Sequence, residues 1–249
     1  KILNKSVNSF YNSKGWKIDK HGNFFDAVSF EDLRVNSQNY LKKNRLSLMK
    51  YFPKYGDILL DCASGPIQYL EYLNYSEYYK KRVCIDFSLE ALKIAKSRDP
   101  KKIEIINGDI LKTNIDKYRY STILCIHTLY HLKKTNQIKV IKKFKKVIKV
   151  DGTIIILYSN PEFLLERIKN IFKIFRQKKP EFIFERFTPS QIKKRFPKAE
   201  FFPFRCLSGE DMKRILPNNF LTKIILLFLN KIEPFLPLFL VQYYVIRLN

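Results

Sequence analysis

The 249-residue sequence predicts one α/β domain organised around a doubly wound sheet. From Asp57 onward, short apolar runs alternate with segments whose apolar residues recur every three or four positions, a pattern typical of buried parallel strands separated by helices. Hydrophobic residues make up 46% of the chain, which is enough to bury one sizeable core. Four strand-helix units feed a fifth strand, and right-handed crossovers between them place helices on both faces of the sheet.

Residues 1–52 are expected to form an N-terminal helical extension that packs on the core or closes over it. Aromatic residues are scattered through this part of the chain, and its last stretch, from about Val35 to Tyr51, is helix-like. The core then occupies residues 53–249.

The first two predicted strands each lead into a helix. The first strand covers residues 58–62 and is followed by a turn and by a helix that contains Ile67, Leu70 and Leu73. The second covers residues 82–87. Its helix begins after Ser88, a favourable N-cap residue, and carries on one face Leu89, Leu92 and Ala95.

Three further strands complete the regular part of the pattern. The third, residues 103–106, stops at Asn107, Gly108 and Asp109, and the fourth covers residues 122–126. A helix from about 135 to 149 follows, with apolar residues at intervals of three and four: Ile138, Ile141, Phe144 and Ile148. Asp151 and Gly152 are expected to end this helix and to start the fifth strand, residues 153–158.

Beyond Asn160 the pattern is less regular. Residues 162–178 predict an amphipathic helix, and residues 188–195 predict another that is entered through Pro189. A strand at 200–206 and an apolar helical insert at 209–240 precede a last strand at 242–248.

The net charge of +24 raises the expectation of a nucleic acid or an anionic membrane surface as a partner. Most of the basic residues are lysines scattered along the chain, whereas specific phosphate and base recognition tends to use arginine. Nucleic acid therefore stays the weaker alternative.

Cysteine use and hydropathy predict a cytoplasmic protein. The four cysteines stand singly in apolar runs, without the spacing of a disulfide framework or a zinc site, and no metal site is predicted. Residues 1–30 lack the continuous apolar stretch of a signal peptide. The apolar stretches 224–229 and 234–241 are both shorter than the roughly 20 residues that span a bilayer, which leaves peripheral contact at the inner face of the membrane as an open alternative.

The sharpest functional signal is the segment LLDCASGP, residues 59–66, at the first strand-to-helix junction. Small residues in such a turn let the backbone approach a ligand, and the N-terminus of a following helix offers free N–H groups. Asp86 ends the second strand and follows Asp61 at about the interval where nucleotide-binding units place a carboxylate for the ribose hydroxyls. A third acid, Asp109, ends the third strand and is placed to accept an adenine amino proton.

Two of these acids also have purely structural interpretations. Asp86 fits the role of a cap for the helix that follows it, alone or with Ser88. Asp109 behind Gly108 fits an ordinary Gly-Asp turn.

Taken together, these motifs resemble those of the class I S-adenosylmethionine-dependent methyltransferases. LLDCASGP resembles the family's glycine-rich first motif, CIDFS its acidic second motif and NGDI its third. STILCIHTLYHL resembles the fourth-strand motif, and VDGTIIIL resembles the entry to the fifth strand. The five motifs occur in order across about residues 55–158, and the likeness extends more weakly to the C-terminus.

The resemblance implies a Rossmann-like, mostly parallel sheet of seven strands whose last strand, 242–248, runs antiparallel. It implies S-adenosyl-L-methionine as the cofactor. The helices within residues 161–195 would then lie on the side of the methyl acceptor, with the N-terminal extension as a lid.

The resemblance also implies which residues bind the cofactor. The methionine moiety is expected at Asp61 and along the turn formed by Ala63, Ser64 and Gly65. The ribose is expected at Asp86 with Phe87, and the adenine at Asp109 with Ile110.

Two departures from the family pattern concern the first motif. The usual first and third glycines are replaced by Ala63 and Ile67, and Pro66 follows the retained Gly65. Alanine is tolerated wherever the backbone keeps a negative φ, so cofactor binding is expected, with weak binding as the alternative.

Two histidines follow the fourth strand. His127 stands where the methyl acceptor and the cofactor should meet, and it is the candidate general base, because a neutral imidazole can take up a hydroxyl proton near neutral pH. A loop histidine facing solvent is the alternative. His131 is expected to have a packing or capping role.

The sequence favours O-methylation of a small molecule or a glycan intermediate. The stretches FFDAVSFEDLR and SGPIQYLEYL look most like those of methyltransferases associated with bacterial surface-polysaccharide functions. An RNA or DNA methyltransferase is the first alternative, although the fourth strand lacks the Asn/Asp-Pro-Pro-aromatic pattern used on base amines. A non-catalytic protein that retains the fold is the second, prompted by Ala63 and Ile67.

Overall fold

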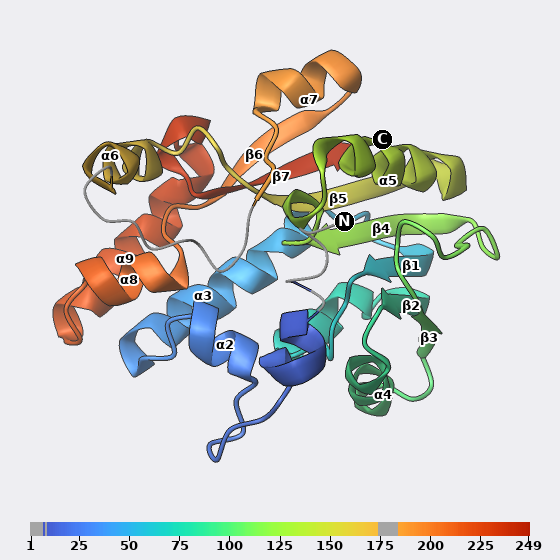
Figure 1. Cartoon of the computed structure of the whole chain (residues 1–249), viewed down its shortest axis with the longest axis horizontal. Coiled ribbons are helices and arrows are strands. Elements are labelled where there is room, and N and C mark those ends of the chain that lie inside the picture. Colours follow the sequence, from blue (N-terminus) through green and yellow to red (C-terminus); the bar gives the residue numbers. More distant parts are fainter. Residues whose placement is uncertain (1–6, 8, 174–183) are drawn as a thin grey trace.

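The computed structural model describes residues 7, 9–173 and 184–249 (Figure 1). Its centre is a seven-stranded sheet in the order β3-β2-β1-β4-β5-β7-β6. The strands are β1 (Gly56–Cys62), β2 (Tyr79–Asp86), β3 (Ile103–Asn107), β4 (Tyr120–Ile126), β5 (Ile148–Ser159), β6 (Glu200–Arg205) and β7 (Tyr243–Leu248). The first five run parallel, and β7 is antiparallel to both β5 and β6. The predicted doubly wound, mostly parallel sheet is therefore confirmed.

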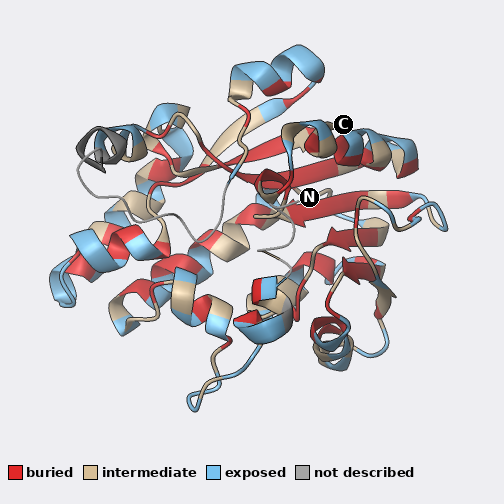
Figure 2. Cartoon of the chain, viewed as in Figure 1, coloured by how far each residue is buried: buried red, intermediate tan, exposed pale blue. Residues whose placement is uncertain are grey.

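The central strands are apolar because helices and loops cover both of their faces (Figure 2). Leu59 and Leu60 of β1, neighbours that point to opposite faces, are both fully buried, and Ile123 and Leu124 of β4 repeat the pattern. The register pairs Cys62 with Cys125, so β1 and β4 end side by side.

Helices precede and separate these strands along the chain. They are α2 (Phe25–Phe30), α3 (Val35–Ser47), α4 (Leu89–Arg98), α5 (Lys134–Val147), α6 (Leu164–Lys173), α7 (Pro189–Arg195), α8 (Gly209–Ile215) and α9 (Phe220–Ile232). Ser88 caps α4 by accepting a hydrogen bond from the Ala91 N–H. Thr188 and Gln191 form a reciprocal capping box at the start of α7. Both starts were predicted from the sequence.

The helix predicted directly after β1 is wrong. Ile67 has a left-handed backbone with φ of 52°, and Tyr69 is extended, so a helical ladder cannot start there. The chain instead forms a 3-10 helix at Leu70–Ser76, and Leu70 is exposed. No α-helix therefore follows directly after the turn that ends β1.

Several smaller predictions also need correction. In α4, Leu92 and Ala95 are buried but Leu89 is exposed. Helix α5 ends at Val147, and Ile148 already belongs to β5, which runs on through Asp151 and Gly152. The predicted helix at 162–178 corresponds to α6 as far as Lys173, and its remaining residues lie outside the described part of the chain.

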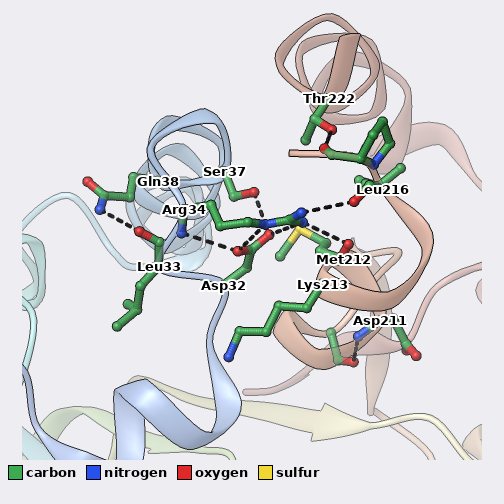
Figure 3. Close-up of polar contacts among 12 residues, drawn as sticks. Asp32, Leu33, Arg34, Ser37, Gln38, Asp211, Met212, Lys213, Leu216 and Thr222 are labelled. Carbon is green, nitrogen blue, oxygen red and sulfur yellow. Dashed lines mark hydrogen bonds and ion pairs between the residues drawn. The ribbon is translucent and has the colours of Figure 1, made fainter. Parts of the chain in front are cut away.

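Arg34 fastens the N-terminal extension to the apolar helical insert through hydrogen bonds to two backbone carbonyls, and an ion pair holds its guanidinium in place (Figure 3). Nη2 of Arg34 lies 2.8 Å from Oδ2 of Asp32, which is fully buried. The same guanidinium donates to the carbonyls of Met212 and Leu216 at 2.8 and 2.9 Å. Because those carbonyls belong to α8 and its C-cap, Arg34 links the start of α3 to α8.

Helices α3 and α9 pack against each other next to this contact, with Tyr40, Leu41, Met212, Leu216 and Leu226 in a shared apolar cluster. Within the described residues, no helix is both long and apolar enough to cross a membrane.

Candidate functional site

A cavity of about 200 Å³ lies at the carboxyl ends of β1, β2 and β4. In doubly wound sheets this edge is where ligands bind. Core segments supply most of the wall, with side chains that include Asp61, Ala63, Ser64, Pro66, Arg82, Asp86, Phe87, Asp109, His127 and Thr128. The N-terminal extension closes the cavity with Val7, Tyr11, Trp16 and Asp26. The structure therefore brings most of the predicted site residues together around one space.

Asp86 ties the turn after β1 to the end of β2. Its Oδ2 accepts a hydrogen bond from the Gly65 N–H at 2.9 Å, and its Oδ1 accepts one from the Ser88 N–H at 2.9 Å. The carboxyl group thus supports the start of α4, as the structural interpretation proposed, while it also lines the cavity. Burial raises the pKa of Asp86 to about 6.

Ala63 and Ile67 keep left-handed backbones, with φ of 55° and 52°, although neither is a glycine. The expectation that Ala63 has a negative φ is therefore wrong. Such a conformation costs an L-residue roughly 1–2 kcal/mol, and for a β-branched residue like isoleucine it is a rare outlier. The turn keeps the backbone conformation that glycine adopts easily, despite this cost in conformational free energy.

Gly65 between them satisfies two requirements at once. Its φ is +53°, and a Cβ atom added to it would lie 2.7 Å from Cη2 of Trp16. The indole of Trp16 therefore rests directly on the Gly65 backbone, which explains why this glycine is retained while its neighbours are not. Gly65 itself is covered and does not line the cavity.

Asp61 is held by an arginine that the sequence analysis did not identify. Arg82 is almost completely buried, and its Nε and Nη2 both donate to Oδ2 of Asp61, the Nε at 3.1 Å. Its Nη1 donates to the carbonyl of Tyr72. The available signal was the position of Arg82 at the start of the predicted strand 82–87, because a guanidinium buried in such a strand needs an acidic partner.

Asp109 forms the turn that was its structural interpretation and also reaches the cavity. Its Oδ1 accepts a hydrogen bond from the Leu111 N–H at 2.9 Å, and the side chain is part of the cavity wall. Ile110 is placed differently, because its side chain lies in the hydrophobic core and its carbonyl accepts a hydrogen bond from Lys143.

His127 stands at the end of β4 with a left-handed backbone, φ 52°. It lines the cavity, and its Nδ1 is buried without a hydrogen-bond partner among the described residues. Its ring lies edge-on to Tyr243 at 4.7 Å between centroids. Burial, reinforced by the charge of Arg205, lowers the pKa of His127 well below its usual value, so the imidazole is neutral near pH 7.

The N-terminal extension contributes one carboxylate to the cavity that the sequence analysis missed. Asp26 accepts hydrogen bonds from the Tyr11 hydroxyl at 2.9 Å and from Nε2 of Gln68 at 3.2 Å. Burial raises the pKa of Asp26 to about 6. No short motif could reveal this residue, because its partners lie far along the chain or in the opposite wall.

The cavity is acidic although the protein is strongly basic. Among the described lining residues, Asp26, Asp61, Asp86 and Asp109 face a single arginine, Arg82, which is already paired. Two further buried polar atoms near the cavity, Nε1 of Trp16 and Oε1 of Gln68, have no partner within the described residues. Such a lining suits a polar ligand that carries positive charge. The described ranges contain no group of three His, Cys, Asp or Glu side chains that could hold a metal ion.

Comparison with known proteins agrees with this geometry. Residues 60–156 match the methyltransferase domain family. No curated protein sequence matches the chain. The fold is similar to that of the DhpI-SAM-HEP complex, with a TM-score of 0.61 and 12% identity over 99% of this chain and 98% of the other.

Two other solved structures show the same fold. Magnesium protoporphyrin IX methyltransferase from Synechocystis with bound SAH has a TM-score of 0.55 and 12% identity over 77% of this chain and 86% of the other. N-methyltransferase NodS from Bradyrhizobium japonicum has a TM-score of 0.55 and 11% identity over 86% and 97%. Residues 60–156 therefore match a methyltransferase domain, and the seven-stranded fold around them is similar to that of solved methyltransferases.

Proposed function

We propose that this methyltransferase O-methylates a hydroxyl group of a small molecule or a glycan intermediate. The observation that carries the proposal is the neutral imidazole of His127 in the wall of the cavity, with a buried Nδ1 that has no partner in the described chain. A base of this kind is needed for a hydroxyl acceptor, which must lose its proton during transfer.

The acidic wall supports binding of S-adenosylmethionine, whose sulfonium and ammonium groups are cationic. In this proposal Asp86 accepts hydrogen bonds from the ribose hydroxyls, and Phe87 lies beside it. Asp61 binds the ammonium group next to the turn of Ala63, Ser64 and Gly65. Asp109 with Ile110 binds the adenine, where Ile110 acts through its backbone because its side chain is in the core.

The bound cofactor supplies a reactive methyl group, so the protein chiefly has to position the acceptor and manage its proton. We assign the first task to the N-terminal wall formed by Tyr11, Trp16 and Asp26. We assign the second to His127. Its lowered pKa keeps it unprotonated at neutral pH, and it lines the same cavity as Ala63 and Ser64, where we propose that the cofactor binds.

The small volume of the cavity and its charge favour a small acceptor over a nucleic acid. Three carboxylates of the described wall, those of Asp26, Asp86 and Asp109, have no cationic partner in it and would repel a phosphate backbone, even though the net charge of +24 would attract one to the outer surface. One of the structural neighbours, magnesium protoporphyrin IX methyltransferase, is named for a small-molecule acceptor. An acceptor from surface-polysaccharide synthesis is the finer form of the proposal, and it rests on the sequence resemblance.

The test has two stages. Calorimetric titration with S-adenosylhomocysteine should show micromolar binding, while NAD as a control should show none. An acceptor screen with nucleotide sugars and glycans, read by mass spectrometry, should then give a product heavier by one methyl group. Binding without turnover on any hydroxyl compound, together with turnover on RNA, would overturn the proposal. Absence of cofactor binding in folded protein would support a non-catalytic role.

A further inference from the structure

Helix α9 has an apolar face that the protein does not cover. Its inner face is fixed by Thr222 and Leu226, which are fully buried against α3 and α8. The opposite face carries large apolar side chains at helical spacing, and Phe220 and Phe228 are 67% and 61% exposed. An ordinary surface helix would be polar there.

We call this outer face the α9 patch, and it consists of Phe220, Leu221, Ile224, Leu227 and Phe228. Exposed apolar residues also precede and follow it, at Ile215 in α8 and at Phe235 in the turn after α9. Figures 1 and 2 show α8 and α9 together at one end of the molecule, with much of their surface exposed. A contiguous apolar surface of this kind marks a site of contact with a partner.

The charges around the patch are positive. Lys223 and Lys231 are exposed on the same helix and form no ion pair with any described residue. The acids of residues 209–240 do not offset them, because Asp211 and Glu233 are buried and Glu210 pairs with Arg214 at 2.7 Å. The patch is therefore apolar and basic.

We propose that the α9 patch docks this protein on an anionic lipid bilayer. A helix that combines exposed phenylalanine and leucine with lysine lies flat at the membrane interface, where apolar side chains enter the acyl boundary and lysines meet the head groups. The 13 residues of α9 are too few to span a bilayer, which needs about 20. This inference goes beyond the methyl transfer and stands whatever the acceptor is.

A lipid surface fits the charges better than a second copy of the chain. Two copies would each bring a net charge of +24 and would place lysines against lysines, whereas an anionic bilayer complements both the lysines and the whole protein. A second copy of the chain is an outcome that the experiment distinguishes.

The test is flotation of the purified protein with phosphatidylcholine vesicles that contain, or lack, one third phosphatidylglycerol. We expect binding to the anionic vesicles and little binding to phosphatidylcholine alone. The double variant Phe220→Ser with Phe228→Ser should lower the partition coefficient by roughly tenfold or more, because two exposed aromatic side chains no longer enter the acyl boundary. Lys223→Glu with Lys231→Glu should lower it to a similar extent.

Two control pairs make the result specific. Tyr55→Ser with Val150→Ser removes equally exposed apolar side chains elsewhere, and Lys142→Glu with Lys145→Glu makes the same charge change on α5. Both controls should float almost like the parent protein. Equal losses in patch and control variants, or parent-like flotation of the patch variants, would overturn the proposal. So would absence of vesicle binding together with a dimer that Phe228→Ser dissociates in analytical ultracentrifugation.

Discussion

The backbone N–H of Gly65 donates a hydrogen bond to Oδ2 of Asp86 at 2.9 Å. This contact joins the glycine-rich turn after β1 to the carboxylate at the end of β2, so the two cofactor motifs form one unit. Any change at Asp86 therefore affects both the carboxylate and the shape of the turn.

Replacing Asp86 by alanine should abolish binding of S-adenosylhomocysteine in calorimetry. The ribose loses its carboxylate, and the Gly65 N–H loses its acceptor. Asp116→Ala, a change on an exposed turn, is the matched control and should bind like the parent protein. Parent-like affinity in folded Asp86→Ala protein would remove the ribose assignment.

Affinity for S-adenosylhomocysteine should fall as the pH drops below about 6. The pKa of Asp86 is raised to about 6, so the ligand-accepting carboxylate becomes protonated in that range. In the ligand-free protein, the raised pKa of Asp86 also makes the stability of the fold depend on pH. The free energy of unfolding is highest below about pH 4, where the carboxyl group is protonated in both the folded and the unfolded state, and it falls as the pH rises through 6.

The free energy of unfolding of Asp86→Asn, relative to that of the parent protein, should therefore be higher at pH 7 than at pH 4, by a few kcal/mol at most. Chemical denaturation at both pH values measures this. Asp26→Asn distinguishes the two acids, because the pKa of Asp26 is also about 6. If Asp26→Asn alone removes the pH dependence of binding, the titrating group is Asp26.

Asp61→Asn should weaken binding of S-adenosylhomocysteine by tenfold or more while binding of methylthioadenosine, which lacks the amino acid part, is kept. The reason is that Asp61 is assigned to the ammonium group alone. Equal losses for both ligands in Asp61→Asn would contradict the assignment.

Arg82→Met should be less stable than the parent protein by about 3–5 kcal/mol, since it leaves a buried carboxylate uncompensated.

His127→Ala should bind S-adenosylhomocysteine like the parent protein but lower kcat for a hydroxyl acceptor by roughly 10²–10⁴-fold. Because the pKa of His127 lies well below its usual value, the rate of the parent enzyme should show no histidine titration between pH 6 and pH 8. Full activity in His127→Ala would assign proton removal to another group.

Ala63→Gly should keep or raise the free energy of unfolding, by up to about 1 kcal/mol, because glycine adopts the φ of 55° without strain. Ala95→Gly in the middle of α4 is the control and should lose about 1 kcal/mol or more. A clear loss of stability in Ala63→Gly would show that the methyl group makes packing contacts that outweigh the strain.

The sheet and the acids at its edge were predictable because strand periodicity and strand ends are local properties of the sequence. Asp61, Asp86 and Asp109 reach one cavity since parallel strands end at the same edge. The failed helix after β1 depended on Ile67, whose left-handed backbone no propensity indicates. Asp26 and the Arg82–Asp61 pair were missed because their contacts are made only when distant segments fold together.

One wall of the cavity belongs to Tyr11 and Trp16, and Trp16 rests on Gly65. A ligand that fills the cavity is therefore expected to contact the N-terminal extension. Its binding free energy is then coupled to the docking of the extension on the core, and the coupling is reciprocal. A ligand that contacts this wall should slow proteolytic cleavage of residues 11–26, and deletion of these residues should weaken binding of that ligand. Protease resistance of residues 11–26 should therefore report occupancy of the cavity before any acceptor is known.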